Sequence, residues 1–141
     1  MAIFLDTGFY LGLVHPKDEN YTKSQQLLDT LKTGIYGQLF TSNLIMAESA
    51  TLVAVRTRKN FQAMRNIREL FVGSGKIAII LRLKEDTEKE AWEIFHKINE
   101  NRSSKVLSYV DCTNIALCHY YSIGNILSYE GHFEGWITNI P

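Results

Sequence analysis

The sequence lacks the marks of several classes of protein. Its 15 basic and 15 acidic residues cancel, so net charge provides no general attraction to nucleic acids or membranes. It has no apolar run of the roughly 18 residues that span a bilayer, and no secretory signal pattern. We therefore expect a cytoplasmic protein with no membrane partner, in which a local patch of cations must bind any polyanion.

Cysteine is scarce, and the pattern excludes a structural zinc site. Cys112 and Cys118 lie six residues apart in one helical stretch, about 240° apart around the axis, so they cannot easily pair with each other. They do not form a CxxC motif, and the four histidines show no paired zinc-ligand spacing. We expect two buried free thiols and no zinc.

The residues that are present favour one compact domain. Hydrophobic residues make up 45% of the 141 residues and charged residues 21%, a balance that allows a sizeable core. Apolar strands alternate with amphipathic helices, and no internal repeat interrupts the pattern. This alternation predicts a single domain over residues 1–141. Its fold class is α/β, with three α/β/α layers, a mostly parallel central sheet and helices on both faces.

Apolar runs and helical spacing place the elements along the chain. Strands are expected at residues 2–5, 35–40, 77–83 and 125–128. Helices are expected at residues 9–14, 44–55 and 60–71, and further helices begin near Asn20, Asp86 and Asp111. Two of these helices have expected N-caps at Asn43 and Asp86.

Four acidic residues stand at the ends or flanks of these elements. Asp6 directly follows the first strand, and Glu130 follows the last. Asp111 sits in the first turn of a helix, and Glu48 projects from the apolar flank of another. Side chains beyond the carboxyl ends of parallel strands share one crevice, so all four can meet there. Taken alone, Asp6 has a plainer explanation as a helix cap, and Glu48 as an exposed edge residue.

Together the four acids predict a metal site. Grouped carboxylates repel one another and resist ionisation, so they need a cation to balance their charge. Hard oxygen ligands select Mg²⁺ or Mn²⁺, which we expect as the cofactor. Such ions activate water and stabilise the leaving oxygen in phosphodiester hydrolysis.

Several stretches carry a resemblance by their order and spacing. They are Ile3–Thr7, Thr41–Glu48, Val110-Asp111 with Asn114–Leu117, and Ile126–Phe133. In this order they resemble the motifs of the PIN domain, the nuclease fold of the VapC toxins and related ribonucleases. The resemblance implies a metal-dependent endoribonuclease that cleaves single-stranded or unstructured RNA, as the toxin of a VapBC-type pair. It also implies a homodimer or higher homo-oligomer and a small antitoxin protein as partners.

The resemblance also implies roles for single residues. Three acids would be metal ligands and two hydroxyl groups would support them by hydrogen bonds, namely Asp6, Glu48 and Asp111, then Thr7 and Ser128. Glu130 stands where the family usually has aspartate. Its longer side chain places the carboxylate differently, so its part in the catalytic set stays open.

A run of cations after the helix at residues 44–55 suits an anionic ligand. Arg56, Arg58 and Lys59 lie close together in the connection to the next helix. We expect them to bind the phosphate backbone of RNA, because an acidic crevice repels it. The alternative is a solvated surface without a ligand.

Other functions fit less well. Asp6-Thr7-Gly8 is shared with aspartic proteases, but Phe9 stands where those proteins have serine or alanine, and they are rich in β-structure. The stretch Gly73–Lys76 looks like the end of a phosphate-binding P-loop, but a strand follows the lysine where that motif requires a helix. The remaining alternative is a catalytically decayed PIN-like domain, retained as an RNA-binding or assembly module.

Overall fold

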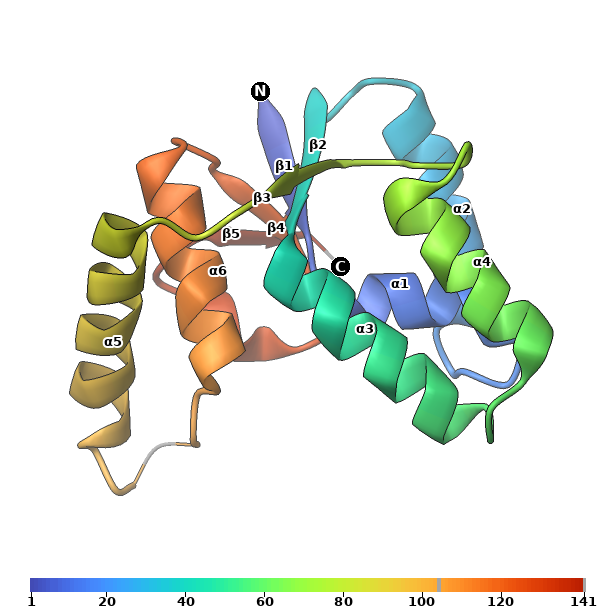
Figure 1. Ribbon diagram of the computed structural model, residues 1–141. Helices are drawn as coiled ribbons and strands as arrows, with labels where there is room; N and C mark the ends of the chain where they lie inside the picture. Colours follow the sequence, from blue (N-terminus) through green and yellow to red (C-terminus); the bar gives the residue numbers. More distant parts are fainter. Residues whose placement is uncertain (104, 141) are drawn as a thin grey trace.

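The computed structural model describes residues 1–103 and 105–140, which form a three-layer α/β/α fold around a parallel sheet (Figure 1). The sheet has five strands in the order β3-β2-β1-β4-β5, and every neighbouring pair is parallel. This confirms the fold class that the sequence predicts. The strands are β1 (Ala2–Leu5), β2 (Gln38–Ser42), β3 (Ile79–Leu81), β4 (Asn125–Leu127) and β5 (Thr138–Ile140).

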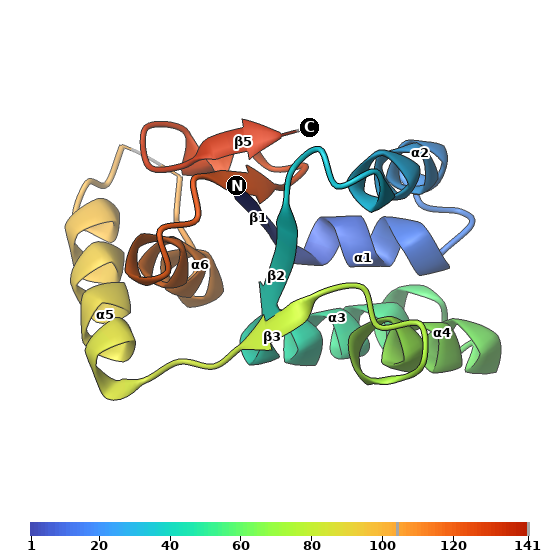
Figure 2. The same ribbon diagram turned by 90° about the horizontal axis from the view of Figure 1, so that it is seen from above.

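Helices cover both faces of the sheet, as predicted. Figure 2 shows α5 and α6 on one face and α1 to α4 on the other. A short 3₁₀ turn, η1 (Gly131–Phe133), follows β4. The helices are α1 (Thr7–Val14), α2 (Tyr21–Lys32), α3 (Asn43–Arg56), α4 (Phe61–Val72), α5 (Glu85–Asn99) and α6 (Tyr109–Tyr120).

The order of the strands reverses at β1. From β1 the chain adds β2 and then β3 on one side, and later places β4 and then β5 on the other. Leu5 at the end of β1 pairs with Leu127 at the end of β4. Ligands of open α/β sheets bind outside the carboxyl ends of the strands at such a reversal. The residues directly after β1 and β4 therefore lie at the favoured place for a site.

Helix α1 is apolar around its whole circumference and is enclosed by its neighbours. Seven of its eight residues are buried, as expected for a helix without a polar face. It packs against α2, α3 and α4, and Tyr10 stacks on Phe71 with ring centroids 4.0 Å apart. Because α1 is held from all sides, the N-terminal end that Asp6 caps has a fixed position.

Two strand predictions differ from the structure, and one strand was not predicted. Strand β2 begins at Gln38 instead of residue 35, because Gly34 and Gly37 adopt positive φ angles of 81° and 75° and turn the chain first. Strand β3 is limited to Ile79–Leu81, where it pairs with β2. Strand β5 was not predicted, because its short polar sequence carries no strand pattern and its pairing with β4 defines it.

Two of the predicted helix caps are also wrong. The N-cap of α3 is Ser42, whose hydroxyl accepts a hydrogen bond from the amide of Ile45, so Asn43 lies inside the helix. The N-cap of α5 is Lys84, whose amide donates a hydrogen bond to the hydroxyl of Thr87.

The expected free thiols of Cys112 and Cys118 are confirmed as buried. Among the described residues, no helix is both long enough and apolar enough to cross a membrane.

The turn before β2 provides a test of the strand register. A Cβ at Gly37 would overlap the backbone carbonyl of Met1, whereas a Cβ at Gly34 meets open space. Gly34→Ala should cost about 1 kcal/mol for its left-handed backbone. Gly37→Ala should cost about 1–3 kcal/mol more, because it pushes β1 from β2. Urea unfolding of both variants measures this, and equal losses would contradict the described contact.

Candidate metal site

A cleft of about 620 Å³ opens at the carboxyl ends of β1 and β4. Its lining includes the four acids that the sequence predicts at a metal site, together with the two hydroxyl-bearing residues expected to support them. These six residues come from segments far apart in the chain, so the fold brings them together. They are Asp6, Glu48, Asp111, Glu130, Thr7 and Ser128.

Asp6 is the most buried of the four acids, because it directly follows the buried strand β1. It is only 8% exposed, and it caps α1 by accepting a hydrogen bond of 2.8 Å from the amide of Thr7 at Oδ1. Asn114 also donates to Oδ1 at 3.3 Å, and the hydroxyl of Ser128 donates to Oδ2 at 2.8 Å. The three donors come from α1, from α6 and from the residue directly after β4. The Oδ2 atom keeps a lone pair that faces no donor among these partners.

The charge of Asp6 is unfavourable in the metal-free site. Burial first, and then the negative charges of Asp111 and Glu48, raise the pKa of its carboxyl group to about 7, against the hydrogen bonds from Thr7 and Ser128 that lower it. The pKa of Glu48 is also raised, by partial burial first and then by Asp111. Carboxylates in one cleft thus hinder one another's ionisation, and a divalent cation would relieve this.

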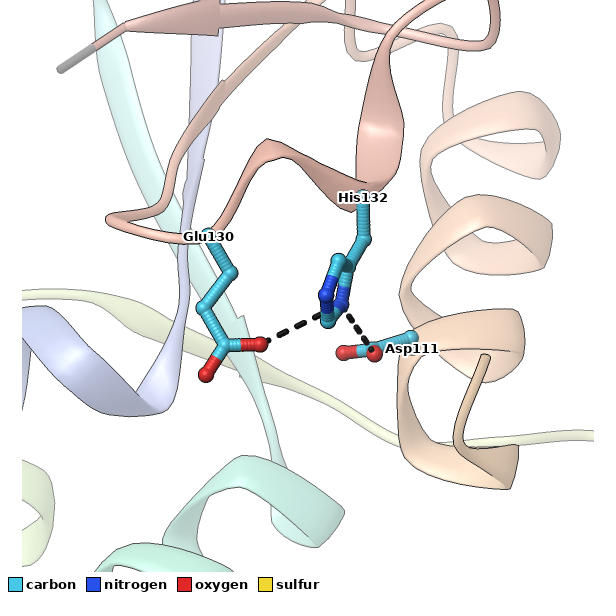
Figure 3. A group of neighbouring side chains, drawn as sticks. All are labelled: Asp111, Glu130 and His132. Carbon is cyan, nitrogen blue, oxygen red and sulfur yellow. Dashed lines mark hydrogen bonds and ion pairs between the residues drawn. The ribbon is translucent and has the colours of Figure 1, made fainter. Parts of the chain in front are cut away.

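Asp111, Glu130 and His132 form a second group of donors at the rim of the cleft, shown in Figure 3. His132 Nδ1 lies 3.2 Å from Asp111 Oδ2 and 3.2 Å from Glu130 Oε2. One ligand atom from each of the three lies within 4.8 Å of the others. Sequence reasoning missed His132, although it stands two residues after Glu130 within the matched stretch.

One buried polar atom supports the presence of a ligand in the cleft. The hydroxyl oxygen of Thr7 is buried and makes no hydrogen bond of standard geometry, although it lies close enough to Glu48 to lower the pKa of that carboxyl group. Thr7 also lines the cleft. A buried polar atom without a partner marks a place for an ion or an ordered water. With the crowded carboxylates, it fits a divalent cation with oxygen ligands.

Of the three cations that the sequence predicts at the site, only one lines the cleft. Arg56, the last residue of α3, lines the cleft. Arg58 lines a neighbouring hollow of about 690 Å³ that Arg56 also borders, and Lys59 lines neither. Lys23 of α2, which the sequence did not single out, lines the cleft as well. Figure 2 shows α2 and α3 on either side of α1, so the two cations that line the cleft come from different helices.

Comparisons with known proteins bear on the family and the fold. A model of the PIN domain family matches residues 3–135. A VapC ribonuclease of Archaeoglobus fulgidus is 29% identical over 135 residues, which are 95% of this chain and 80% of that protein. The crystal structure of VapC20 of Mycobacterium tuberculosis, a sarcin–ricin loop cleaving toxin, matches with a TM-score of 0.75 and 22% identity over 96% of each chain. At that identity, the structural match shows a shared fold.

The raised pKa of Asp6 predicts how stability depends on pH in chelator. The folded state keeps this proton until about pH 7, against 3.8 for an ordinary aspartate. Protonation of Asp6 therefore stabilises the folded state below about pH 4, and this stabilisation is lost as the pH rises to about 7. The lost free energy of unfolding is on the order of a few kcal/mol.

Asp6→Asn should remove this pH dependence, because asparagine still caps α1 but does not ionise. Relative to wild type, the variant should gain stability steadily between pH 4 and pH 7 in urea unfolding experiments. Asp86→Asn, in the first turn of α5 and outside the lining of the cleft, controls for loss of a surface charge. Parallel curves of unfolding free energy against pH for wild type and Asp6→Asn would contradict the raised pKa of the buried Asp6 carboxyl group.

Proposed function

The chain belongs to the PIN domain family, and on that premise we propose that it is a metal-dependent endoribonuclease. The observation that carries the proposal is the meeting of Asp6, Glu48 and Asp111 in one cleft at the reversal of strand order. Acids from three separate segments converge there at the cost of raised pKa values for two of them. Such an arrangement suits a cation better than it suits the metal-free protein.

The three acids would hold Mg²⁺ or Mn²⁺. When bound, the cation supplies a positive charge that lowers the pKa of water and stabilises the leaving oxygen of a phosphodiester. Ser128 and the amide of Thr7 orient the Asp6 carboxylate through hydrogen bonds of 2.8 Å each. Burial of Asp6 excludes water from one side of the site. The protein residues thus provide orientation and charge, and the metal provides electrophilic activation.

The substrate we propose is single-stranded or unstructured RNA, and its support is the name of the Archaeoglobus relative, a VapC ribonuclease. We further propose a toxin of the VapBC type with a small antitoxin as partner, in a homodimer or higher homo-oligomer in the cytoplasm. The VapC20 match supports the fold on which this proposal rests. We propose residues 1–141 as one domain, since the single sheet runs from β1 to β5.

Asp111→Asn should abolish metal-dependent RNA cleavage without unfolding the domain, because it removes a ligand charge and keeps the shape of the side chain. Cleavage of an unstructured RNA is measured with Mg²⁺, with Mn²⁺ and with chelator. Asp86→Asn is the matched control, since Asp86 also lies in the first turn of a helix. Undiminished cleavage by Asp111→Asn would refute the assigned site. Binding of RNA by wild type without any cleavage would favour the decayed module instead.

Arg56→Gln should weaken RNA binding, because Arg56 borders the cleft and makes no ion pair among the described residues. One lost phosphate contact should lower the salt slope of binding by about 0.7. The measurement uses the Asp111→Asn background, in which the RNA stays intact. Lys59→Gln is the control from the same cationic run, and its slope should stay near that of the parent. Equal effects of the two substitutions would show a diffuse surface instead of a contact at the cleft.

A further inference from the structure

We propose that His132 is a nitrogen ligand of the metal, which it binds together with Asp111 and Glu130. The site would then take a mixed set of oxygen and nitrogen donors and prefer Mn²⁺ to Mg²⁺. The inference rests on the proposed function, because it concerns the cation of the same cleft. It adds a ligand and a metal preference that oxygen donors alone would not give.

The spacing of the donor atoms fits one shared cation. His132 Nδ1 is 3.2 Å from Asp111 Oδ2 and equally far from Glu130 Oε2. Ligands at about 2.1 Å from an octahedral ion lie about 3 Å apart when they are adjacent. The two separations of 3.2 Å therefore leave room for an ion bound to all three groups after small side-chain movements. Figure 3 shows the three side chains pointing toward one common point.

Hydrogen bonding alone does not satisfy this group. An imidazole Nδ1 carries at most one hydrogen, so it cannot make a full bond to both carboxylates at once. Each carboxylate also faces the negative charge of the other across the ring nitrogen. A cation among the three groups would engage the nitrogen lone pair and both acids together. The buried hydroxyl of Thr7 in the same cleft, which makes no hydrogen bond of standard geometry, points independently to a ligand.

The backbone holds two of the donors in place. The amide of Glu130 donates to the Ser128 hydroxyl at 3.2 Å, and its carbonyl accepts from Asn139 at 3.3 Å. Phe133, the residue after His132, is completely buried and anchors the 3₁₀ turn. The positions of Glu130 and His132 are thus set by one short segment. The side chain of Glu130 is 65% exposed, so its reach toward Asp111 depends on the partner it finds there.

Asp111 is placed by a different element. It stands in the first turn of α6, where its amide donates to the hydroxyl of the N-cap Ser108 at 3.0 Å. The donor set therefore bridges α6 and the segment after β4. A metal bound there would tie the two segments together.

The donor type determines which metal is favoured. Carboxylate oxygens suit both Mg²⁺ and Mn²⁺, whereas imidazole binds transition metals and is a poor ligand for Mg²⁺. A site with His132 should therefore bind Mn²⁺ more tightly than Mg²⁺. Removing the imidazole should weaken Mn²⁺ binding more than Mg²⁺ binding.

The test is pulsed electron paramagnetic resonance of Mn²⁺ on the full chain, purified without a histidine tag. The spectrum of wild type should contain the nuclear coupling of an imidazole ¹⁴N, and His132→Gln should lose it. Calorimetry should show Mn²⁺ affinity lowered by roughly tenfold or more, with a smaller change for Mg²⁺. His119→Gln is the matched control, because His119 also pairs with a carboxylate, Glu90, at 2.9 Å. Its coupling and affinities should equal those of wild type.

Two results would overturn the inference: bound Mn²⁺ without nitrogen coupling in wild type, or coupling that persists in His132→Gln. Equal losses of Mn²⁺ and Mg²⁺ affinity without a coupling change would make His132 a group that only orients Glu130. Metal-dependent RNA cleavage by wild type is measured separately. Cleavage without nitrogen coupling would refute this inference alone. Coupling without cleavage would refute the proposed function and leave the metal ligand in place.

Discussion

The site depends on the burial of one carboxylate at the end of the central strand. Ile3, Phe4 and Leu5 are completely buried, so β1 delivers Asp6 where water can hydrate it only slightly. A buried carboxylate is costly unless donors surround it, and its donors come from α1, α6 and the end of β4. A single side chain thus links three elements around the cleft. The residues that pack the core around β1 therefore also determine the position of Asp6 in the site.

Much of the fold follows from local pattern, and the strand that the sequence does not predict depends on a tertiary contact. The apolar run of β1 and the helical spacing of α4 predict their elements within one or two residues, because burial imposes those periods directly. Strand β5 is different, since Thr138–Ile140 has no strand pattern and exists through its pairing with β4. The cap of α3 is a local exception: the residues Ser42 and Asn43 can both cap a helix, and it is the Ser42 hydroxyl that accepts the hydrogen bond from the amide of Ile45.

The acids could be found from sequence because each stands at the end or flank of an element. Two other residues that line the cleft could not be found from sequence, because their positions depend on how distant segments pack. His132 reaches Asp111 only through the turn after β4, and Lys23 reaches the cleft only because α2 packs against α1. Neighbours in sequence also separate in space. After Arg56 ends α3, Arg58 and Lys59 take positive φ angles of 54° and 60° and lead the chain toward α4.

The charge of the cleft couples metal binding to RNA binding. Besides the proposed ligands, Asp18 and Glu19 line it, so acids outnumber the cations Lys23 and Arg56 there. A chain of zero net charge offers no compensating field at longer range. A phosphodiester would be repelled from the metal-free cleft and attracted once a divalent cation neutralises it. Coupling of this kind is reciprocal. Under the proposed function, RNA phosphates therefore raise the affinity for the cation by the same factor by which the cation raises the affinity for RNA.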